Sequence, residues 1–279
     1  MPNAALSPRF SLAALTVLEL SPPEMIAVAA EAGYDAVGLR LIPATPEEHH
    51  FPLANDKLLL RRTQQALRDT GIKVLDIEIL RLKPETHIVE EFAHILDTGA
   101  ELGASEVLVA GNDEDLVRTQ DNFAQLCELA KSRGLHPHLE FMPWTGVKNL
   151  EQAARVVGAM RSRGIDNACL LVDAFHFNRS ASRLETLANV PTEWLRYVQL
   201  CDVVGSIPSD MNEILRQARQ ERCFPGDGDI ELISLLHALP HDIPISLEIP
   251  TEGLRQQGVS ALERAQRALT KTRELLAAL

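Results

Sequence analysis

The stretch RGIDNACLLVDAFH, residues 163–176, contains the pattern that decides the fold. Gly164 follows a helix-like segment at the place where a C-cap glycine belongs. The apolar run after it has the length and composition of a buried strand, and it ends in a carboxylate, Asp173. The same joint, a glycine between a helix-like segment and an apolar run, recurs at Gly33, Gly71, Gly103 and Gly134.

Short apolar runs and longer amphipathic segments alternate along the whole chain. The expected strands are 10–18, 36–41, 73–79, 105–110, 136–141, 168–174, 197–202 and 244–249. The expected helices include 23–32, 57–70, 90–102, 121–133, 150–163 and 234–239. Such alternation is typical of a parallel sheet with right-handed crossovers. Eight units in 279 residues predict an α/β protein, a (β/α)8 TIM barrel that fills one domain, 1–279. A doubly wound open sheet is the alternative, although the chain contains no GxGxxG or Walker A motif.

Composition narrows the class of partner. The 39 acidic and 27 basic residues give a net charge of −12, whereas nucleic-acid binding needs a basic surface. The four cysteines form no CxxC pair and are expected to be reduced thiols. The apolar N-terminal stretch 10–20 contains Glu19 and is too short to span a membrane. We therefore expect a cytoplasmic protein that acts on a small-molecule substrate, with neither nucleic acid nor a membrane as a partner.

Polar side chains interrupt four of the predicted strands near their carboxyl ends. They are Glu140, Asp173, Gln199 and Glu248. Because strand residues alternate between two faces, and the opposite face is apolar in each run, these side chains should face the barrel axis. TIM barrels keep their active sites at the carboxyl ends of the strands. Burying unpaired carboxylates is costly, so we expect a compensating charge. The oxygen-rich set suits Mn²⁺ or Mg²⁺, with Co²⁺ or Zn²⁺ as alternatives, and ion pairs with Arg40, His138 or lysines are the other interpretation.

Several motifs occur together and in order over the second half of the chain. They are Glu140, the DAFH segment 173–176, Gln199 followed by Asp202, the PGDGDI segment 225–230 and Glu248 in SLEIP. In this order the chain resembles the xylose isomerase-like TIM barrels, a superfamily of sugar isomerases, epimerases and related lyases also called AP endonuclease 2. The resemblance runs from about residue 10 to the end of the chain.

The resemblance implies a role for each motif residue. Glu140 and Glu248 resemble the paired carboxylates that hold the metal and move a proton between adjacent carbons, and Asp173 resembles a metal ligand. His176 and Arg222 resemble residues that contact substrate oxygens. Ketose 3-epimerases of this superfamily carry a metal-binding histidine where this chain has Gln199. Glutamine there resembles instead the hydroxypyruvate isomerase and 3-dehydroshikimate dehydratase branches. Homo-oligomers are common in the superfamily.

Other residues near the expected site have two interpretations each. Arg40 either binds a carboxylate or phosphate of the substrate or forms a salt bridge with Glu78 or Asp76. His138 either contacts the substrate or a metal ligand or forms a hydrogen bond within the core. The segment 204–223, whose middle reads as a helix, is either a lid or a support for Arg222. Further candidates for the pocket wall are Glu19, Glu78 and Trp144.

The expected function is a divalent-metal-dependent isomerase or epimerase of a small polyhydroxy carbonyl compound, a sugar or keto acid. A carboxylate removes the proton next to a carbonyl, and the charge of the resulting enediolate is stabilised. A dehydratase such as 3-dehydroshikimate dehydratase shares the early step and is the alternative. An endonuclease IV-type enzyme would need a histidine-rich zinc site and a basic surface, which this chain lacks. A non-catalytic sugar-binding barrel is the last alternative.

Overall fold

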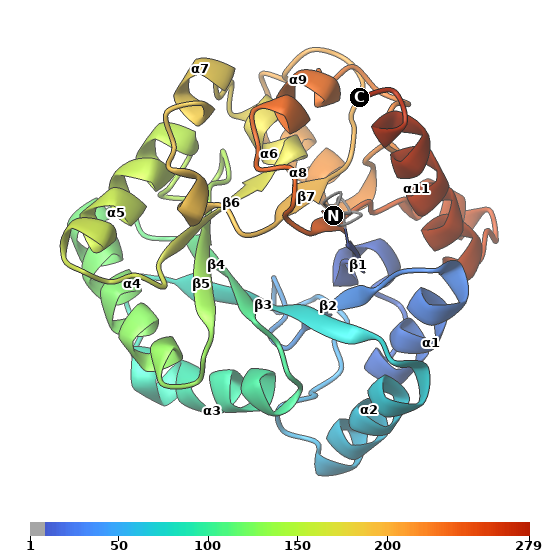
Figure 1. Cartoon of the computed structure of the whole chain (residues 1–279), viewed down its shortest axis with the longest axis horizontal. Helices are drawn as coiled ribbons and strands as arrows, with labels where there is room; N and C mark the ends of the chain where they lie inside the picture. Colours follow the sequence, from blue (N-terminus) through green and yellow to red (C-terminus); the bar gives the residue numbers. More distant parts are fainter. Residues whose placement is uncertain (1–8) are drawn as a thin grey trace, which may run out of the picture.

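The chain folds into a closed barrel of eight parallel strands surrounded by helices (Figure 1). The computed structural model describes residues 9–279, so the first eight residues of the expected domain 1–279 lie outside the described part. Each strand pairs with the next in sequence, and β8 closes the barrel against β1 through Ser11 and Ser246. The predicted (β/α)8 TIM barrel is confirmed, and the doubly wound sheet is excluded.

The strands lie where the apolar runs predict them, with one exception. Their bounds are β1 Phe10–Leu12, β2 Ala36–Arg40, β3 Lys73–Leu82, β4 Glu106–Gly111, β5 His136–Glu140, β6 Cys169–Asp173, β7 Val198–Leu200 and β8 Ile245–Leu247. The strand expected over 10–18 is wrong beyond Leu12, because a 3₁₀ helix, η1 (Ala14–Val17), follows it. The Thr16 hydroxyl donates to the carbonyl of Leu247 and accepts from the amide of Ile249, which holds this turn against the end of β8.

The helices follow the strands as expected. The long ones are α1 Pro22–Ala32, α2 Lys57–Thr70, α3 Ile88–Glu101, α4 Leu116–Lys131, α5 Leu150–Ser162 and α11 Ala261–Leu276. The short ones are α6 Ala174–Arg179, α7 Leu184–Leu187, η2 Thr192–Trp194, α8 Met211–Gln220, α9 Leu232–His237 and α10 Glu252–Gln256. The helix expected from residue 121 begins earlier because Asp115 caps it, its carboxylate accepting from the amides of Val117 and Arg118.

The five joint glycines confirm the helix-end prediction. All of them adopt positive φ, from 70° at Gly134 to 90° at Gly33, where a side chain would be strained. Each glycine therefore ends its helix in a left-handed turn and sends the chain into the next strand.

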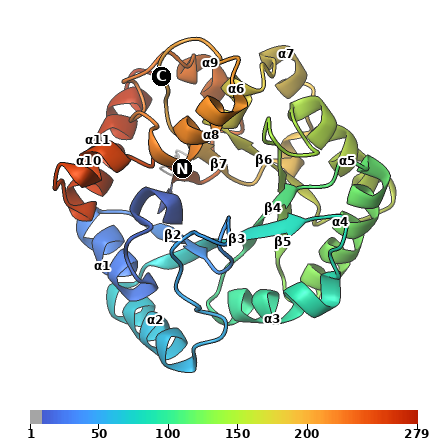
Figure 2. The same cartoon turned by 180° about the vertical axis from the view of Figure 1, so that it is seen from behind.

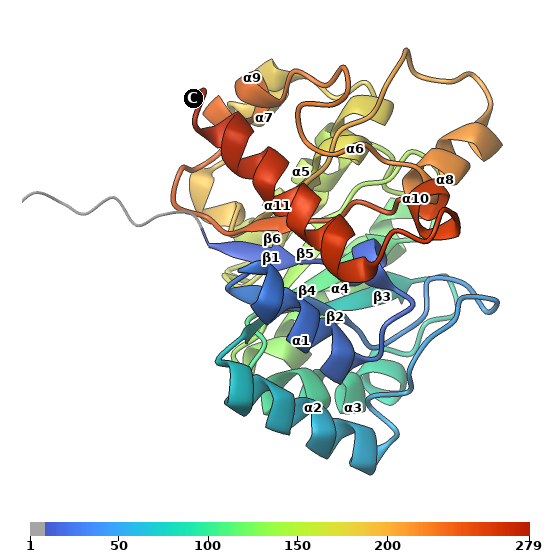
Figure 3. The same ribbon diagram turned by 90° about the vertical axis from the view of Figure 1, so that its right-hand side faces the viewer.

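The barrel interior differs from the layer between strands and helices. That outer layer is apolar, with Leu12, Val37, Leu139 and Leu170 among its buried side chains. Inside the barrel a smaller apolar cluster, which includes Leu108, Leu171 and Tyr197, occupies the middle. Charged side chains occupy the two ends. Seen from the side and from behind, α8, α10 and the loop after β2 lie at the carboxyl ends of the strands (Figures 2 and 3). Within residues 9–279, no helix combines the length and the apolar character needed to cross a membrane.

Candidate active site

A small cavity of about 50 Å³ lies at the carboxyl end of the barrel. Glu140 is the last residue of β5, Asp173 is the last of β6, Gln199 is the middle residue of β7 and Glu248 directly follows β8. All four side chains are buried. The residues that line the cavity include Glu78, Glu140, Trp144, His176, Arg222 and Glu248. Strand alternation therefore brings the predicted polar set to the end of the barrel where the sequence places it.

Three buried side chains form a cluster with the dimensions of a metal site. One ligand atom each from Glu140, Asp173 and His176 lies within 4.8 Å of the other two. The Nε2 atom of His176 is 3.6 Å from Oε1 of Glu140. Asp173 is the N-cap of α6, and its Oδ1 accepts a 3.0 Å hydrogen bond from the amide of His176. In the DAFH segment, Asp173 is therefore the N-cap and His176 is the third residue of the helix. This spacing places the carboxylate and the imidazole next to each other at the start of α6.

Arg222 supplies positive charge to the carboxylates. Its Nη1 donates to Oδ2 of Asp173 at 2.8 Å, and its Nη2 is 2.9 Å from Oε2 of Glu248. The Nε atom donates to the carbonyl of Ala218 in α8, which fixes the guanidinium. The neighbouring carboxylates raise the pKa of Arg222 against the effect of burial. The cation that pairs with these acids is therefore Arg222, and not Arg40, His138 or a lysine.

Several buried polar atoms in the cluster and beside it have no partner among the described residues. They are Oε1 of Glu140, Oε1 of Gln199 and Nδ1 of His176. The amide nitrogen of Gln199 donates to Oε1 of Glu248 at 3.4 Å, which leaves its oxygen available. Buried polar atoms without partners are rare in folded proteins, and these carboxylate, amide and imidazole donors suit a divalent ion. The residues present therefore fit a divalent metal, with His176 in the cluster and Glu248 held beside it by Arg222.

The environment raises the proton affinity of both glutamates. Burial, with the charges of Asp173 and Glu248, raises the pKa of Glu140 well above its ordinary value. Burial raises the pKa of Glu248 to about 7, although Arg222 opposes this shift. Burial lowers the pKa of His176 to about 4, so its imidazole is neutral near pH 7, the form that binds metals. A carboxyl group with a pKa near 7 can exchange a proton in both directions at neutral pH.

Arg40 and His138, the two inward residues with two interpretations, both form internal pairs. Nε of Arg40 donates to Oε1 of Glu78 at 3.2 Å, and its Nη1 donates to Glu48 at 3.1 Å. His138 lies deeper than Glu140 on the same face of β5, with Nε2 2.7 Å from Oε2 of Glu106, and it does not line the cavity. The salt bridge expected for Arg40 and the core hydrogen bond expected for His138 are therefore present. As substrate contacts the two residues are untested predictions.

The remaining candidates divide between the cavity and its surroundings. The indole ring of Trp144 lines the cavity with its centroid 5.1 Å from that of His176. Glu19 pairs instead with Arg264 of α11. The PGDGDI segment wraps around Asp202, whose carboxylate accepts from the amides of Gly226, Gly228 and Ile230. This motif therefore shapes the turn after Arg222 rather than lining the cavity itself.

Sequence reasoning missed Arg81, Glu48 and Arg219, which also line the cavity. Counting by twos from Asp76 and Glu78 directs Arg81 away from the axis. The pairing of β3 with β4 shifts register between Ile77 and Leu80, and this shift turns Arg81 toward the cavity. Glu48 and Arg219 come from a loop and from α8, so no strand pattern could have indicated them.

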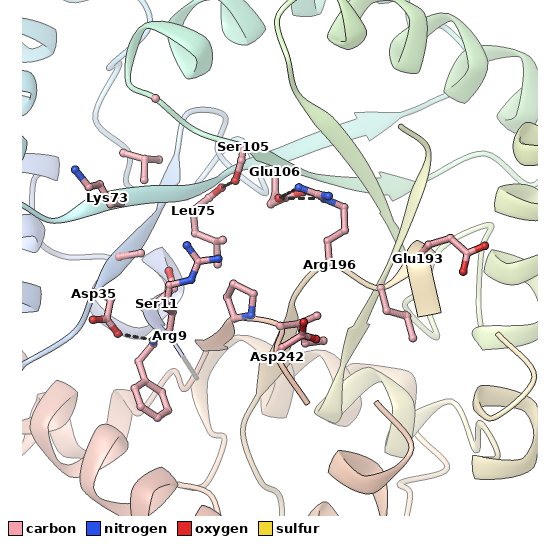
Figure 4. Close-up of a pocket in the computed structure, with 17 residues that line it drawn as sticks. Arg9, Ser11, Asp35, Lys73, Leu75, Ser105, Glu106, Glu193, Arg196 and Asp242 are labelled. Carbon is pink, nitrogen blue, oxygen red and sulfur yellow. Dashed lines mark hydrogen bonds and ion pairs between the residues drawn. The ribbon is translucent and has the colours of Figure 1, made fainter. Parts of the chain in front are cut away.

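A larger cavity lies at the opposite end of the barrel. It measures about 620 Å³, and the residues around it come from the amino ends of the strands (Figure 4). In this cavity, Nε of Arg196 donates to both carboxylate oxygens of Glu106, and its Nη2 donates to Oε1. None of the eight predicted site residues lines it. Its size therefore does not mark it as the site of the predicted chemistry.

The closed barrel, with a buried polar cluster at its carboxyl end, defines a protein of the TIM-barrel class. The chain belongs to the xylose isomerase-like TIM barrel family, whose model matches residues 26–275. The expected resemblance is therefore confirmed.

Individual relatives include two kinds of enzyme. A 3-dehydroshikimate dehydratase of Pseudomonas aeruginosa is 28% identical over 252 residues, which cover 84% of this chain and 37% of that protein. The chain thus spans little more than a third of that relative. An inosose isomerase of Bacillus velezensis is 25% identical over 225 residues, 74% of each chain. The crystal structure of IOLI protein with a binding zinc atom superposes with a TM-score of 0.78 at 21% identity, covering 97% of this chain and 98% of that one.

Proposed function

We propose that this protein is a divalent-metal-dependent isomerase or epimerase of a small polyhydroxy carbonyl compound. The observation that carries the proposal is the pair of buried carboxyl groups, Glu140 and Glu248, whose pKa values are raised beside a cluster with unpartnered ligand atoms. The zinc atom in the IOLI protein structure supports a metal in a barrel of this fold. Inosose isomerase among the relatives supports a ring-shaped hydroxy-ketone as substrate.

Residues of the cluster would hold the metal. The predicted ligands are Glu140, Asp173, the free amide oxygen of Gln199 and the carboxylate of Glu248. The grouping of His176 with Glu140 and Asp173 adds the imidazole to this set, whereas the resemblance implied a substrate contact for His176. When bound, a divalent ion supplies positive charge that draws electrons from a carbonyl oxygen and acidifies the adjacent C–H group.

Proton transfer is assigned to the two glutamates. Glu248, with a pKa of about 7, accepts the proton from the carbon next to the carbonyl. Glu140 returns a proton, either to the other face of that carbon or to the next carbon. Arg222 keeps Glu248 oriented through the 2.9 Å contact and offers positive charge to developing oxyanions. Trp144 closes one side of the cavity and limits access of water.

A dehydratase is the second candidate. The 28% identity to 3-dehydroshikimate dehydratase over 84% of this chain favours it. The same proton removal, followed by loss of a hydroxyl group from the next carbon, gives dehydration. Incubation with 3-dehydroshikimate distinguishes the two candidates, because dehydration yields an aromatic product with a new ultraviolet absorbance whereas isomerisation does not.

The metal content of the purified protein tests the proposal. We expect about one divalent ion per chain in the wild type, and loss of that ion in the double variant Glu140→Ala/Glu248→Ala. The double variant Glu90→Ala/Glu151→Ala, at exposed helix positions, is the control and should keep the ion. A wild-type protein that binds no divalent ion after dialysis against an excess of Mn²⁺, Mg²⁺ and Zn²⁺ would overturn the proposal.

A further inference from the structure

Arg81 is a cation of the cavity wall that lacks an anionic partner. Its Nη1 donates to the neutral side-chain oxygen of Asn112 at 2.9 Å. Arg81 makes no ion pair within residues 9–279, and its Nε is buried without a hydrogen-bond partner. Burial, reinforced by the positive charge of Arg40, lowers the pKa of Arg81 to about 10. A guanidinium in this state is costly to bury, and an anion beside it would remove the cost.

Arg81 is half-buried, and the two fully buried arginines of the cavity, Arg40 and Arg222, are already matched. Arg40 pairs with Glu48 and Glu78. Arg222 pairs with Asp173 and Glu248. These pairs occupy Glu48, Glu78, Asp173 and Glu248. The remaining carboxyl group of the cavity, Glu140, forms no ion pair with Arg81 among the described residues, although its charge opposes the lowering of the Arg81 pKa.

Arg219 adds a second unmatched cation to the same wall. It extends from α8, lines the cavity with Arg81 and forms no ion pair in the described part of the chain. The positive charge of Arg219 is among the causes that lower the pKa of Arg81, so the two guanidinium groups repel each other. The wall formed by Arg81 and Arg219 is therefore a region of excess positive charge beside the catalytic carboxylates.

The unpaired N–H groups of the Arg81 guanidinium are arranged to bind an oxyanion. With Nη1 bound to Asn112, the parallel Nε–H and Nη2–H groups remain without partners within residues 9–279. Two parallel N–H groups match the two oxygens of a carboxylate or a phosphate. We propose that Arg81, assisted by Arg219, binds an oxyanion of the substrate. The substrate is then an acidic polyhydroxy carbonyl compound and not a neutral sugar, an inference that rests on the proposed function.

Two pairs of unreactive or slowly reacting probes test this subsite by titration calorimetry on the metal-loaded protein. Shikimate has a carboxylate that its methyl ester lacks, and ribulose 5-phosphate has a phosphate that ribulose lacks. We expect the charged member of at least one pair to bind about 10- to 100-fold more tightly. In Arg81→Leu the preference for the charged probe should fall to about twofold or less. Arg81→Lys should retain part of the preference, because lysine keeps the positive charge but lacks the two parallel N–H groups.

Arg62→Leu is the matched control, since it removes one exposed arginine from α2 and should keep the full preference. An Arg81-dependent preference in the shikimate pair assigns the oxyanion to a carboxylate, and one in the ribulose pair assigns it to a phosphate. Equal binding of charged and neutral members, no binding of any probe, or a preference that survives Arg81→Leu would overturn the inference. If Arg81→Leu does not fold, the wild-type comparison and Arg81→Lys decide it.

The proposed function can fail independently of this subsite. Its failure would appear as a missing metal ion or as absent hydrogen exchange at the substrate. An Arg81-dependent preference found together with either result would leave an acidic-ligand site in a barrel without the proposed chemistry.

Discussion

The two ends of the barrel interior both contain buried carboxylates, but their surroundings shift the pKa values of these groups in opposite directions. At the amino end, Glu106 accepts from Arg196 and lies 2.7 Å from His138. Burial by itself would raise the pKa of Glu106, yet these hydrogen bonds and charges outweigh it and hold the pKa at about 2. At the carboxyl end, Glu140 and Glu248 have raised pKa values, and an oxygen of Glu140 has no partner in the described chain.

The contrast supports the roles proposed above, a structural carboxylate at Glu106 and proton-transferring carboxyl groups at Glu140 and Glu248. Glu106 is fully paired, stays ionised and ties β4 to β5 and to Arg196, two residues before β7. Glu140 and Glu248 are held close to one another and to Asp173, where each additional negative charge is unfavourable. Perturbed pKa values of this kind concentrate at functional sites. The pKa shifts favour the carboxyl end of the barrel as the functional end. Cavity volume alone would favour the amino end, because the larger cavity borders Glu106.

The largest expected effect is on proton transfer at the carboxyl end. Glu248→Gln should keep the fold, because glutamine has the same shape, and should slow exchange of the substrate α-hydrogen with solvent by about 10²- to 10⁴-fold. Mass spectrometry of substrate incubated in D₂O measures this rate. The same change at the amino end, Glu106→Gln, should leave exchange within a few-fold. Undiminished exchange in Glu248→Gln would remove Glu248 as the acid–base residue.

Arg222→Met tests how strongly the carboxyl end depends on its cation. The substitution leaves Asp173 and Glu248 buried without their ion pair, so the metal-free protein should lose about 3–5 kcal/mol of unfolding free energy. Urea unfolding in the presence of a chelator measures the loss. Arg183→Met, which breaks an exposed pair with Glu185, is the control and should have a much smaller effect. Equal effects in both variants would mean that another group compensates the buried carboxylates.

The pH dependence of stability in Glu106→Gln tests whether Glu106, at the amino end of the barrel, is held in its ionised form. The pKa of Glu106 is lowered from 4.5 to about 2 on folding, so its ionised form stabilises the protein above the unfolded pKa. We expect the free energy of unfolding of the wild type to exceed that of the variant by on the order of 3 kcal/mol near neutral pH. This advantage should disappear as the pH falls from about 4.5 through about 2. Urea unfolding of both proteins across this range would show parallel curves if Glu106 were not held in its charged form.

Gln199→His should have the smallest effect. Imidazole is also a metal ligand, so the metal affinity is expected to change by no more than about tenfold. Calorimetric titration with Mn²⁺ or Zn²⁺ measures the affinity, and Gln199→Leu, which offers no ligand atom, should lower it further. Complete loss of metal in Gln199→His would indicate that the amide orients Glu248 through the 3.4 Å contact instead of binding the metal.

Much of the fold and of the site could be read from local patterns. The five joint glycines and the strand runs predicted the barrel, because a C-cap glycine and a buried strand are both local features. Alternation in β5 and β6 correctly directed Glu140 and Asp173 toward the axis. The same rule failed for Arg81, because the register shift in β3 changes the phase of the strand. The strand expected beyond Leu12 also failed, because Thr16 bonds to β8, which is distant in sequence.

The sequence by itself determined the barrel, the end of the barrel at which the candidate site lies and the residue types available there. These depend on periodicity and on local turn chemistry, which neighbouring residues specify. Only the tertiary structure decided which charges pair. Arg222 reaches Asp173 and Glu248 from the end of α8, Arg40 is occupied by Glu48 and Glu78, and Arg81 remains unmatched. Ion pairing depends on distances of a few ångströms between side chains far apart in the chain, and no local pattern encodes those distances.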